Sequence, residues 1–145
     1  MIILDANVLL YAYDLDAPQR PTVLKRLSDL AAGKEAIAFP WITIWAFLRI
    51  STNARIYAQP KSSTEAFAII HGWLEIPGVV TINPGPRHTN ILEDLITTCA
   101  AFGPKVTDAA LAALAIENGA TIASTDLDFR RFPSIRWVNP LGSER

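Results

Sequence analysis

Four aspartates stand where apolar segments of this chain end or where a helix is expected to begin: Asp5, Asp108, Asp126 and Asp128. The carboxyl ends of parallel strands share one edge of a sheet, and open α/β sheets bind their ligands along that edge. Carboxylates gathered there repel one another unless a cation joins them. The sequence therefore predicts an acidic metal site. Oxygen donors without a cysteine or histidine cluster favour Mg²⁺, with Mn²⁺ as a substitute.

The order of apolar segments indicates the fold class. Short apolar runs typical of buried strands occupy residues 2–4, 36–39, 79–82, 121–124 and 136–138. Helical spacing of apolar residues fills 22–32, 41–50, 64–75, 87–101 and the segment from Thr107-Asp108 to Asn118, while residues 6–13 fit a loop or a short helix. Strands separated by helices pair in parallel through right-handed crossovers. We therefore expect one α/β domain over residues 1–145, a three-layer α/β/α sandwich with a four- to five-stranded parallel sheet.

Composition narrows the function classes. The formal net charge is −1, so the chain lacks the strongly basic balance of many nucleic-acid-binding domains. Cys99 is the only cysteine, which excludes an intrachain disulfide. Met-Ile-Ile-Leu is too short for a signal peptide, and apolar stretches fall short of the roughly 18 residues that cross a membrane. We expect a cytoplasmic protein without a membrane partner.

Basic residues near the predicted acidic site are candidates for binding phosphates. These candidates are Arg49, Arg55, Arg130 and Arg131. The alternative for each arginine is a scattered solubilising charge. Each aspartate also has a plain alternative, as a turn residue, a helix N-cap or a partner of the helix dipole. Glu117 lies nine residues after Asp108, about half a helical revolution, so we assign it to the solvated face. His71 and His88 are expected to be structural or solvent-facing.

Three segments resemble the acidic motifs of PIN-domain ribonucleases: LDANVLLYA, VTDAALAALAIENGA and STDLDFRRF. Together with PWITIWAFLRIST they are similar to VapC-type toxins of toxin–antitoxin pairs, and the resemblance extends from Ile2 to Leu141. It implies a Mg²⁺-dependent endoribonuclease, a homodimer and a small antitoxin partner that covers an apolar groove near residues 41–48, often with a basic side chain facing the acids.

The resemblance also implies roles for individual residues. Asp5, Asp108 and Asp126 match the metal ligands, and Asp128 matches a less constant companion. Asn7 and Thr125 match polar neighbours that orient the ligands. The chain departs from the family pattern near Ala46-Phe47, where many members carry a glutamate. This departure leaves open whether one or two ions bind.

Other functions remain open at the level of sequence. A module that keeps the fold without activity would share the same pattern, and a nuclease acting on DNA is a weaker alternative. A receiver-like phosphoacceptor domain also places aspartates and Mg²⁺ at strand ends. It requires adjacent acids after the first strand and an aspartate near mid-chain, whereas Asp5 has no acidic neighbour and the run Val79–Ile82 ends without an aspartate.

Overall fold

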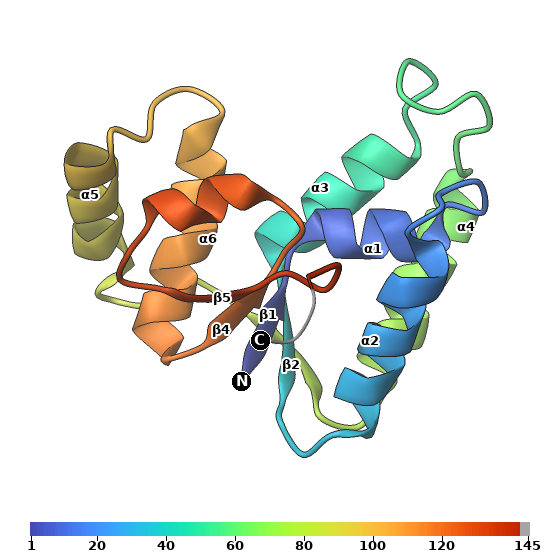
Figure 1. Cartoon of the computed structure of the whole chain (residues 1–145), viewed down its shortest axis with the longest axis horizontal. Coiled ribbons are helices and arrows are strands. Elements are labelled where there is room, and N and C mark those ends of the chain that lie inside the picture. The colour runs from blue at the N-terminus through green and yellow to red at the C-terminus, as the bar shows by residue number, and fades with distance from the viewer. Residues whose placement is uncertain (143–145) are drawn as a thin grey trace.

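Five parallel strands form the middle layer of the protein in the computed structural model, which describes residues 1–142 (Figure 1). The strands are β1 (Ile2–Leu4), β2 (Ile37–Pro40), β3 (Val79–Ile82), β4 (Thr121–Ala123) and β5 (Arg136–Val138). Their order across the sheet is β3-β2-β1-β4-β5, and each neighbouring pair is parallel. The predicted α/β class and parallel sheet are confirmed, with five strands.

Helices fill both outer layers. They are α1 (Ala6–Tyr13), α2 (Arg20–Ala32), α3 (Trp41–Ser51), α4 (Ser63–Leu74), α5 (His88–Cys99), α6 (Lys105–Asn118) and the short 3₁₀ helix η1 (Leu127–Arg131). The segment after Asp5 is therefore helical rather than a loop. Helix α6 begins at Lys105, ahead of the predicted start at Thr107-Asp108, and Asp108 lies in its first turn.

The sheet packs a separate hydrophobic core on each face, because neighbouring residues of a strand point to opposite sides. Ile2 and Leu4 of β1 pack with apolar residues of α1, α2, α3 and α4. Ile3 packs on the other face against α5, α6 and η1. Figure 1 shows the two helical groups on either side of the sheet. These layers confirm the predicted α/β/α sandwich.

The chain changes winding direction beside β1. From β1 it proceeds outward through β2 to β3, then returns to the other side of β1 to form β4 and β5. The carboxyl ends of β1 and β4 are adjacent, since the Asp5 N–H donates to the Ala123 carbonyl at 3.0 Å. A point where strand order reverses is the usual ligand-binding position of an open α/β sheet. The fold therefore brings the residues after β1 and β4 together at such a position.

Glu117 does not lie on a solvated face, so that prediction was wrong. Its side chain is 9% exposed, and its carboxylate accepts hydrogen bonds from the Gly85 N–H at 2.9 Å and the Arg87 N–H at 3.1 Å. His88 Nδ1 lies 3.7 Å away from it. The angular argument correctly placed Glu117 opposite Asp108. That side of α6, however, packs against the segment leading into α5, and this contact could not be seen in local periodicity.

The two histidines have different environments. His71 is exposed on α4 and stacks on Phe67, with ring centroids 6.1 Å apart. His88 is buried at the first position of α5. Among the helices of residues 1–142, none has the length and apolar character required to cross a membrane.

Candidate metal centre

Three carboxylates from two elements meet at the carboxyl edge of the sheet. Asp108 comes from the first turn of α6, while Asp126 and Asp128 follow β4. One oxygen of each carboxylate lies within 4.8 Å of an oxygen of each of the others. Asp126 is the N-cap of η1, and its Oδ1 accepts the Asp128 N–H at 2.8 Å. The tight turn that follows β4 therefore holds both aspartates near Asp108.

Asp5 faces this trio from the end of β1. It is the N-cap of α1, and its Oδ1 accepts the Ala6 N–H at 2.7 Å. Its Oδ2 accepts the Ser124 hydroxyl at 2.7 Å. The Ser124 hydroxyl that donates to Asp5 also accepts the Asp126 N–H at 3.0 Å, so one side chain joins Asp5 to Asp126. The structure thus clusters Asp108, Asp126 and Asp128, and places Asp5 next to them through Ser124.

Ser124 links the ends of β1 and β4, a role that sequence reasoning missed. Its side chain is fully buried. The hydroxyl donates to Asp5 and accepts from Asn7 Nδ2 and the Asp126 N–H, each at 3.0 Å. Thr125 contributes its backbone N–H, which donates to Asn7 Oδ1 at 3.3 Å. The position of Ser124, a small polar residue directly before Thr125-Asp126, could have indicated this role.

The cluster makes ionisation of its buried members costly. Burial raises the pKa of Asp5 from 3.8 to about 6; hydrogen bonds from Ser124 and Ala6 oppose the rise, and Asp108 and Asp126 add to it. The pKa of Asp108 is also raised, first by burial and then by Asp126, while Lys105 and Arg131 act in the opposite direction. Raised carboxyl pKa values at one cleft are typical of a functional site.

Two cations border the acidic trio on the side of Asp128. Lys105 Nζ forms an ion pair with Asp128 Oδ2, and Arg131 Nη2 lies 3.9 Å from Asp128 Oδ1. Lys105 was not among the residues predicted from the sequence. Its position one helical turn before Asp108 could have indicated that it lies near the acidic site. Among the predicted phosphate-binding arginines, Arg131 is placed beside the acids by this contact.

The other three candidate arginines are exposed. Arg49 lies in the last turn of α3, and Arg55 lies in the segment between α3 and α4. Arg130 places its guanidinium over the Trp137 ring, 5.8 Å from its centroid. The structure assigns none of these three a contact with the aspartates.

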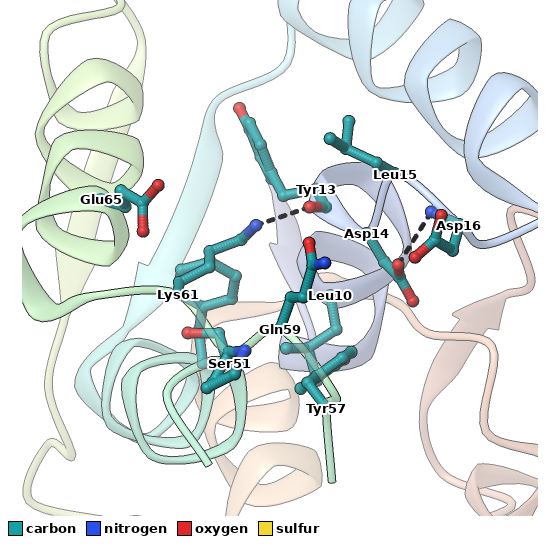
Figure 2. Close-up of a pocket in the computed structure, with 12 residues that line it drawn as sticks. Leu10, Tyr13, Asp14, Leu15, Asp16, Ser51, Tyr57, Gln59, Lys61 and Glu65 are labelled. Atoms are coloured by element: carbon teal, nitrogen blue, oxygen red, sulfur yellow. Dashed lines mark hydrogen bonds between the residues drawn. The ribbon is translucent and has the colours of Figure 1, made fainter. Parts of the chain in front are cut away.

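A cavity of about 390 Å³ opens beside Asp126, Asn7 and Thr125. It shares Leu10, Asp14 and Tyr57 with a second hollow of about 270 Å³, so the two form one groove along α1. The second hollow, shown in Figure 2, has Asp14 and Asp16 on one side and Glu65 and Lys61 on the other.

The Lys61 ammonium donates to the Tyr13 carbonyl at 2.7 Å (Figure 2). The pKa of Glu65 is lowered, first by its hydrogen bonds with Ser62 and also by the charge of Lys61. With Asp14, Asp16 and Glu65 against this single lysine, the hollow is acidic. It should repel phosphate groups and attract basic side chains. The cations Lys105 and Arg131 border the other side of the aspartates.

Helix α3, which has Ala46-Phe47 where many family members carry a glutamate, is attached to the end of β1 through Thr43. Thr43 Oγ1 donates to the Leu4 carbonyl at 2.7 Å and so fastens α3 to the end of β1. Phe47 is fully buried in the core. On the outside of the same helix Trp41 and Trp45 form a tilted pair, 6.4 Å between centroids, with Trp45 63% exposed. The apolar segment 41–48 is therefore part core and part open surface.

The donor set fits a hard divalent cation. The clustered ligand atoms are carboxylate oxygens, which suit Mg²⁺ and Mn²⁺ better than softer metals. Asp5 keeps its charge at neutral pH only against the cost of burial, and a nearby cation would offset that cost. The clustered carboxylates of Asp108, Asp126 and Asp128 therefore have the chemistry to hold such an ion, and Ser124 joins Asp5 to Asp126 beside them.

An open parallel sheet with carboxylates clustered at the point where its strand order reverses is typical of a protein that binds phosphates through a metal ion. Residues 2–135 match the family model described as PIN domain, and the chain belongs to this family. It is 37% identical over 140 residues to Ribonuclease VapC37 of Mycobacterium tuberculosis (strain ATCC 25618 / H37Rv), covering 97% of each chain. It is 39% identical over 140 residues to Ribonuclease VapC31 of the same strain, covering 97% of this chain and 99% of the relative.

A solved structure has the same fold at lower sequence identity. This is VapBC2 from Rickettsia felis bound to a DNA fragment from their promoter, with a TM-score of 0.70 and 20% identity over 96% of this chain and 98% of that chain. The likeness supports the sheet and its helical layers along nearly the whole chain. The predicted resemblance to PIN-domain proteins is confirmed.

Proposed function

We propose that this protein is an endoribonuclease that hydrolyses RNA phosphodiester bonds with Mg²⁺, or Mn²⁺ as a substitute, and acts as the toxin of a toxin–antitoxin pair. The observation that carries the proposal is the cluster of Asp108, Asp126 and Asp128, to which Ser124 joins Asp5 where β1 and β4 end side by side. The relatives named Ribonuclease VapC37 and VapC31 support the activity and the substrate. An RNA substrate also fits the expected cytoplasmic location.

Asp5, Asp108 and Asp126 would hold the ion. When bound, such an ion lowers the pKa of an attacking water and offsets charge on the leaving oxygen. Ser124 and Asn7 keep the Asp5 carboxylate in one orientation, since the Ser124 hydroxyl donates to Asp5 and is itself fixed by Asn7. Ligands held by such outer contacts bind metals more tightly than free ones. The protein therefore supplies a prearranged anionic site rather than a nucleophilic side chain.

The partner we propose is a small antitoxin protein with a basic segment. The acidic hollow formed by Asp14, Asp16 and Glu65 continues into the cavity beside Asp126, so a basic segment could cover both at once. The exposed pair Trp41 and Trp45 offers apolar surface of the kind that protein interfaces use. A homodimer, as the family resemblance implies, would provide a second way to cover part of this surface.

The central experiment is cleavage of labelled single-stranded RNA by the purified protein with Mg²⁺ or Mn²⁺, compared with EDTA. We expect cleavage with metal, none with EDTA, and loss of cleavage in Asp5→Asn and Asp108→Asn variants that keep their circular dichroism spectra. Equal cleavage by wild type and Asp5→Asn would refute the assignment of the site.

A DNA strand of the same sequence serves as the matched substrate control. Preferential cleavage of DNA would favour the alternative that the protein is a nuclease acting on DNA. Absence of cleavage together with absence of Mn²⁺ binding would favour the inactive binding module. Membership of the PIN-domain family sets aside the receiver-like alternative.

A further inference from the structure

Both oxygens of Asp128 face cations of the protein itself. Oδ2 pairs with Lys105 Nζ, and Oδ1 lies 3.9 Å from Arg131 Nη2. The side chains of Lys105 and Asp128 are 32% and 41% exposed, so the pair stands at the rim of the site and can meet a ligand. Asp128 thus differs from Asp5, whose carboxylate accepts hydrogen bonds from the uncharged Ser124 hydroxyl and Ala6 N–H.

Local structure fixes this arrangement. Arg131 follows Asp128 by three residues in η1, a spacing that places side chains above one another in a 3₁₀ helix. Lys105 precedes Asp108 by three residues in α6, so its charge lies beside the acidic trio along the helix surface. Arg131 is further restrained because its Nη1 donates to the Cys99 carbonyl at 3.5 Å. The two cations therefore come from different elements and converge on one carboxylate.

We propose that Asp128 is an anchor that holds Lys105 and Arg131 at the site to bind an RNA phosphate, rather than a ligand of the metal. This inference rests on the proposed ribonuclease function and revises the expectation that all four aspartates bind the ion. The Asp128 carboxylate lies in the same cluster as those of Asp108 and Asp126. An ion that used Asp128 would nevertheless have to displace a lysine from it, whereas Asp5 and Asp126 accept from uncharged groups. Asp128 is thus a positioning residue, and Lys105 and Arg131 make the contact with substrate.

The charges on the two sides of the site favour approach of the RNA from the side of Lys105 and Arg131. The groove along α1 ends in the hollow with Asp14, Asp16 and Glu65, which repels phosphates. Lys105 and Arg131 belong to α6 and η1, which pack on the other face of the sheet from α1. A phosphodiester backbone is attracted by paired basic groups, and each such contact adds to the salt dependence of binding. The RNA backbone should therefore cross the rim at Asp128 instead of following the acidic hollow.

The matched pair Asp126→Asn and Asp128→Asn tests the proposal, because both variants remove one carboxylate from the same turn. Mn²⁺ binding is measured by calorimetry on each purified variant. We expect Asp126→Asn to lose about tenfold or more in affinity, as removal of a ligand should, and Asp128→Asn to stay within about threefold of wild type. Loss of Mn²⁺ affinity in Asp128→Asn equal to that in Asp126→Asn would overturn the proposal.

RNA binding provides the second readout. A fluorescein-labelled single-stranded RNA is titrated in EDTA, where metal-dependent cleavage does not occur, with Lys105→Met, Asp128→Asn and the double variant. Lys105→Met should weaken binding and lower the salt slope by about one unit, and Asp128→Asn should weaken binding because Lys105 and Arg131 lose their anchor. The double variant should bind no more weakly than Lys105→Met, because the residues act as one unit. Unchanged RNA binding in Asp128→Asn would overturn the proposal even if Mn²⁺ binding were retained.

Failure of the proposed function has a separate signature. In that case the wild-type protein would neither bind Mn²⁺ nor cut RNA, and both proposals would fall together. Cleavage by the wild type with Mn²⁺ loss in Asp128→Asn would leave the ribonuclease assignment intact and remove only the anchor role. Asp94→Asn, which changes an exposed carboxylate on α5, is the control that should leave both readouts unchanged.

Discussion

Replacing Asp5 with asparagine should stabilise the metal-free protein at neutral pH. Burial is the main cause that raises the pKa of Asp5 from 3.8 to about 6 in the folded state. A group whose folded pKa is raised binds its proton more tightly when folded, so stability falls as pH rises from the unfolded pKa through the folded one. A shift of roughly two units corresponds to about 3 kcal/mol of lost stability at pH 7. Asparagine resembles the protonated acid and avoids this loss.

The expected gain is smaller than that ceiling, since asparagine cannot reproduce both hydrogen bonds that Asp5 accepts from Ala6 and Ser124. We expect a gain of about 1–2 kcal/mol in the free energy of unfolding at pH 7, or about 3–6 °C in the midpoint for a chain of this length. Thermal unfolding in EDTA, followed by circular dichroism from pH 4 to pH 7.5, measures it. The gain should vanish near pH 4, where Asp5 is protonated in the wild type too.

The control is Asp94→Asn, which removes an exposed carboxylate from α5 and should show no such pH dependence. The reasoning would be refuted if Asp5→Asn were no more stable than wild type at pH 7, or if its advantage stayed constant down to pH 4. The first result would mean that Asp5 is ionised at little cost. The second would mean that the gain comes from packing instead of charge.

Three further predictions follow from contacts at and away from the site. Ser124→Ala should destabilise the fold by about 1–3 kcal/mol in denaturant, because Asn7 and Asp5 lose a buried partner, and should raise the pKa of Asp5 further in a carboxyl NMR titration. Gly85→Ala should lower the unfolding midpoint, since a Cβ there would lie 2.5 Å from Glu117 Oε1, and the loss should shrink in a Glu117→Ala background. Mn²⁺ at about 100 times its dissociation constant should stabilise the wild type by about 2.7 kcal/mol and Asp5→Asn by clearly less, as differential scanning calorimetry can show.

Local sequence was sufficient for much of the fold. Strand β3 was predicted to the residue, because Val79–Ile82 is apolar and Pro84-Gly85-Pro86 prevents its continuation. Strand β5 was likewise predicted at Arg136–Val138. The start of α6 was placed too late, since Pro104 begins the helix before the polar pair that served as the signal. These elements depend on neighbours in sequence, which a single chain reveals.

The parts of the site that escaped prediction depend on neighbours in space. The bond between Ser124 and Asp5 joins residues 119 positions apart. The contact between Lys105 and Asp128 requires α6 and η1 to lie on the same face of the sheet. The burial of Glu117 depends on where the segment before α5 crosses the end of α6. A periodicity argument gives the direction of a side chain on its helix and cannot say what lies there.

The order of strands also determines when during synthesis the site can assemble. Strand β1 leaves the ribosome first, yet it lies in the centre of the sheet and pairs with β4, which emerges near the end of the chain. A nascent chain that stops short of Ser124 lacks both the partner of Asp5 and the later acids. Contacts so distant in sequence form late and slowly. Incomplete chains should therefore lack the assembled acidic site.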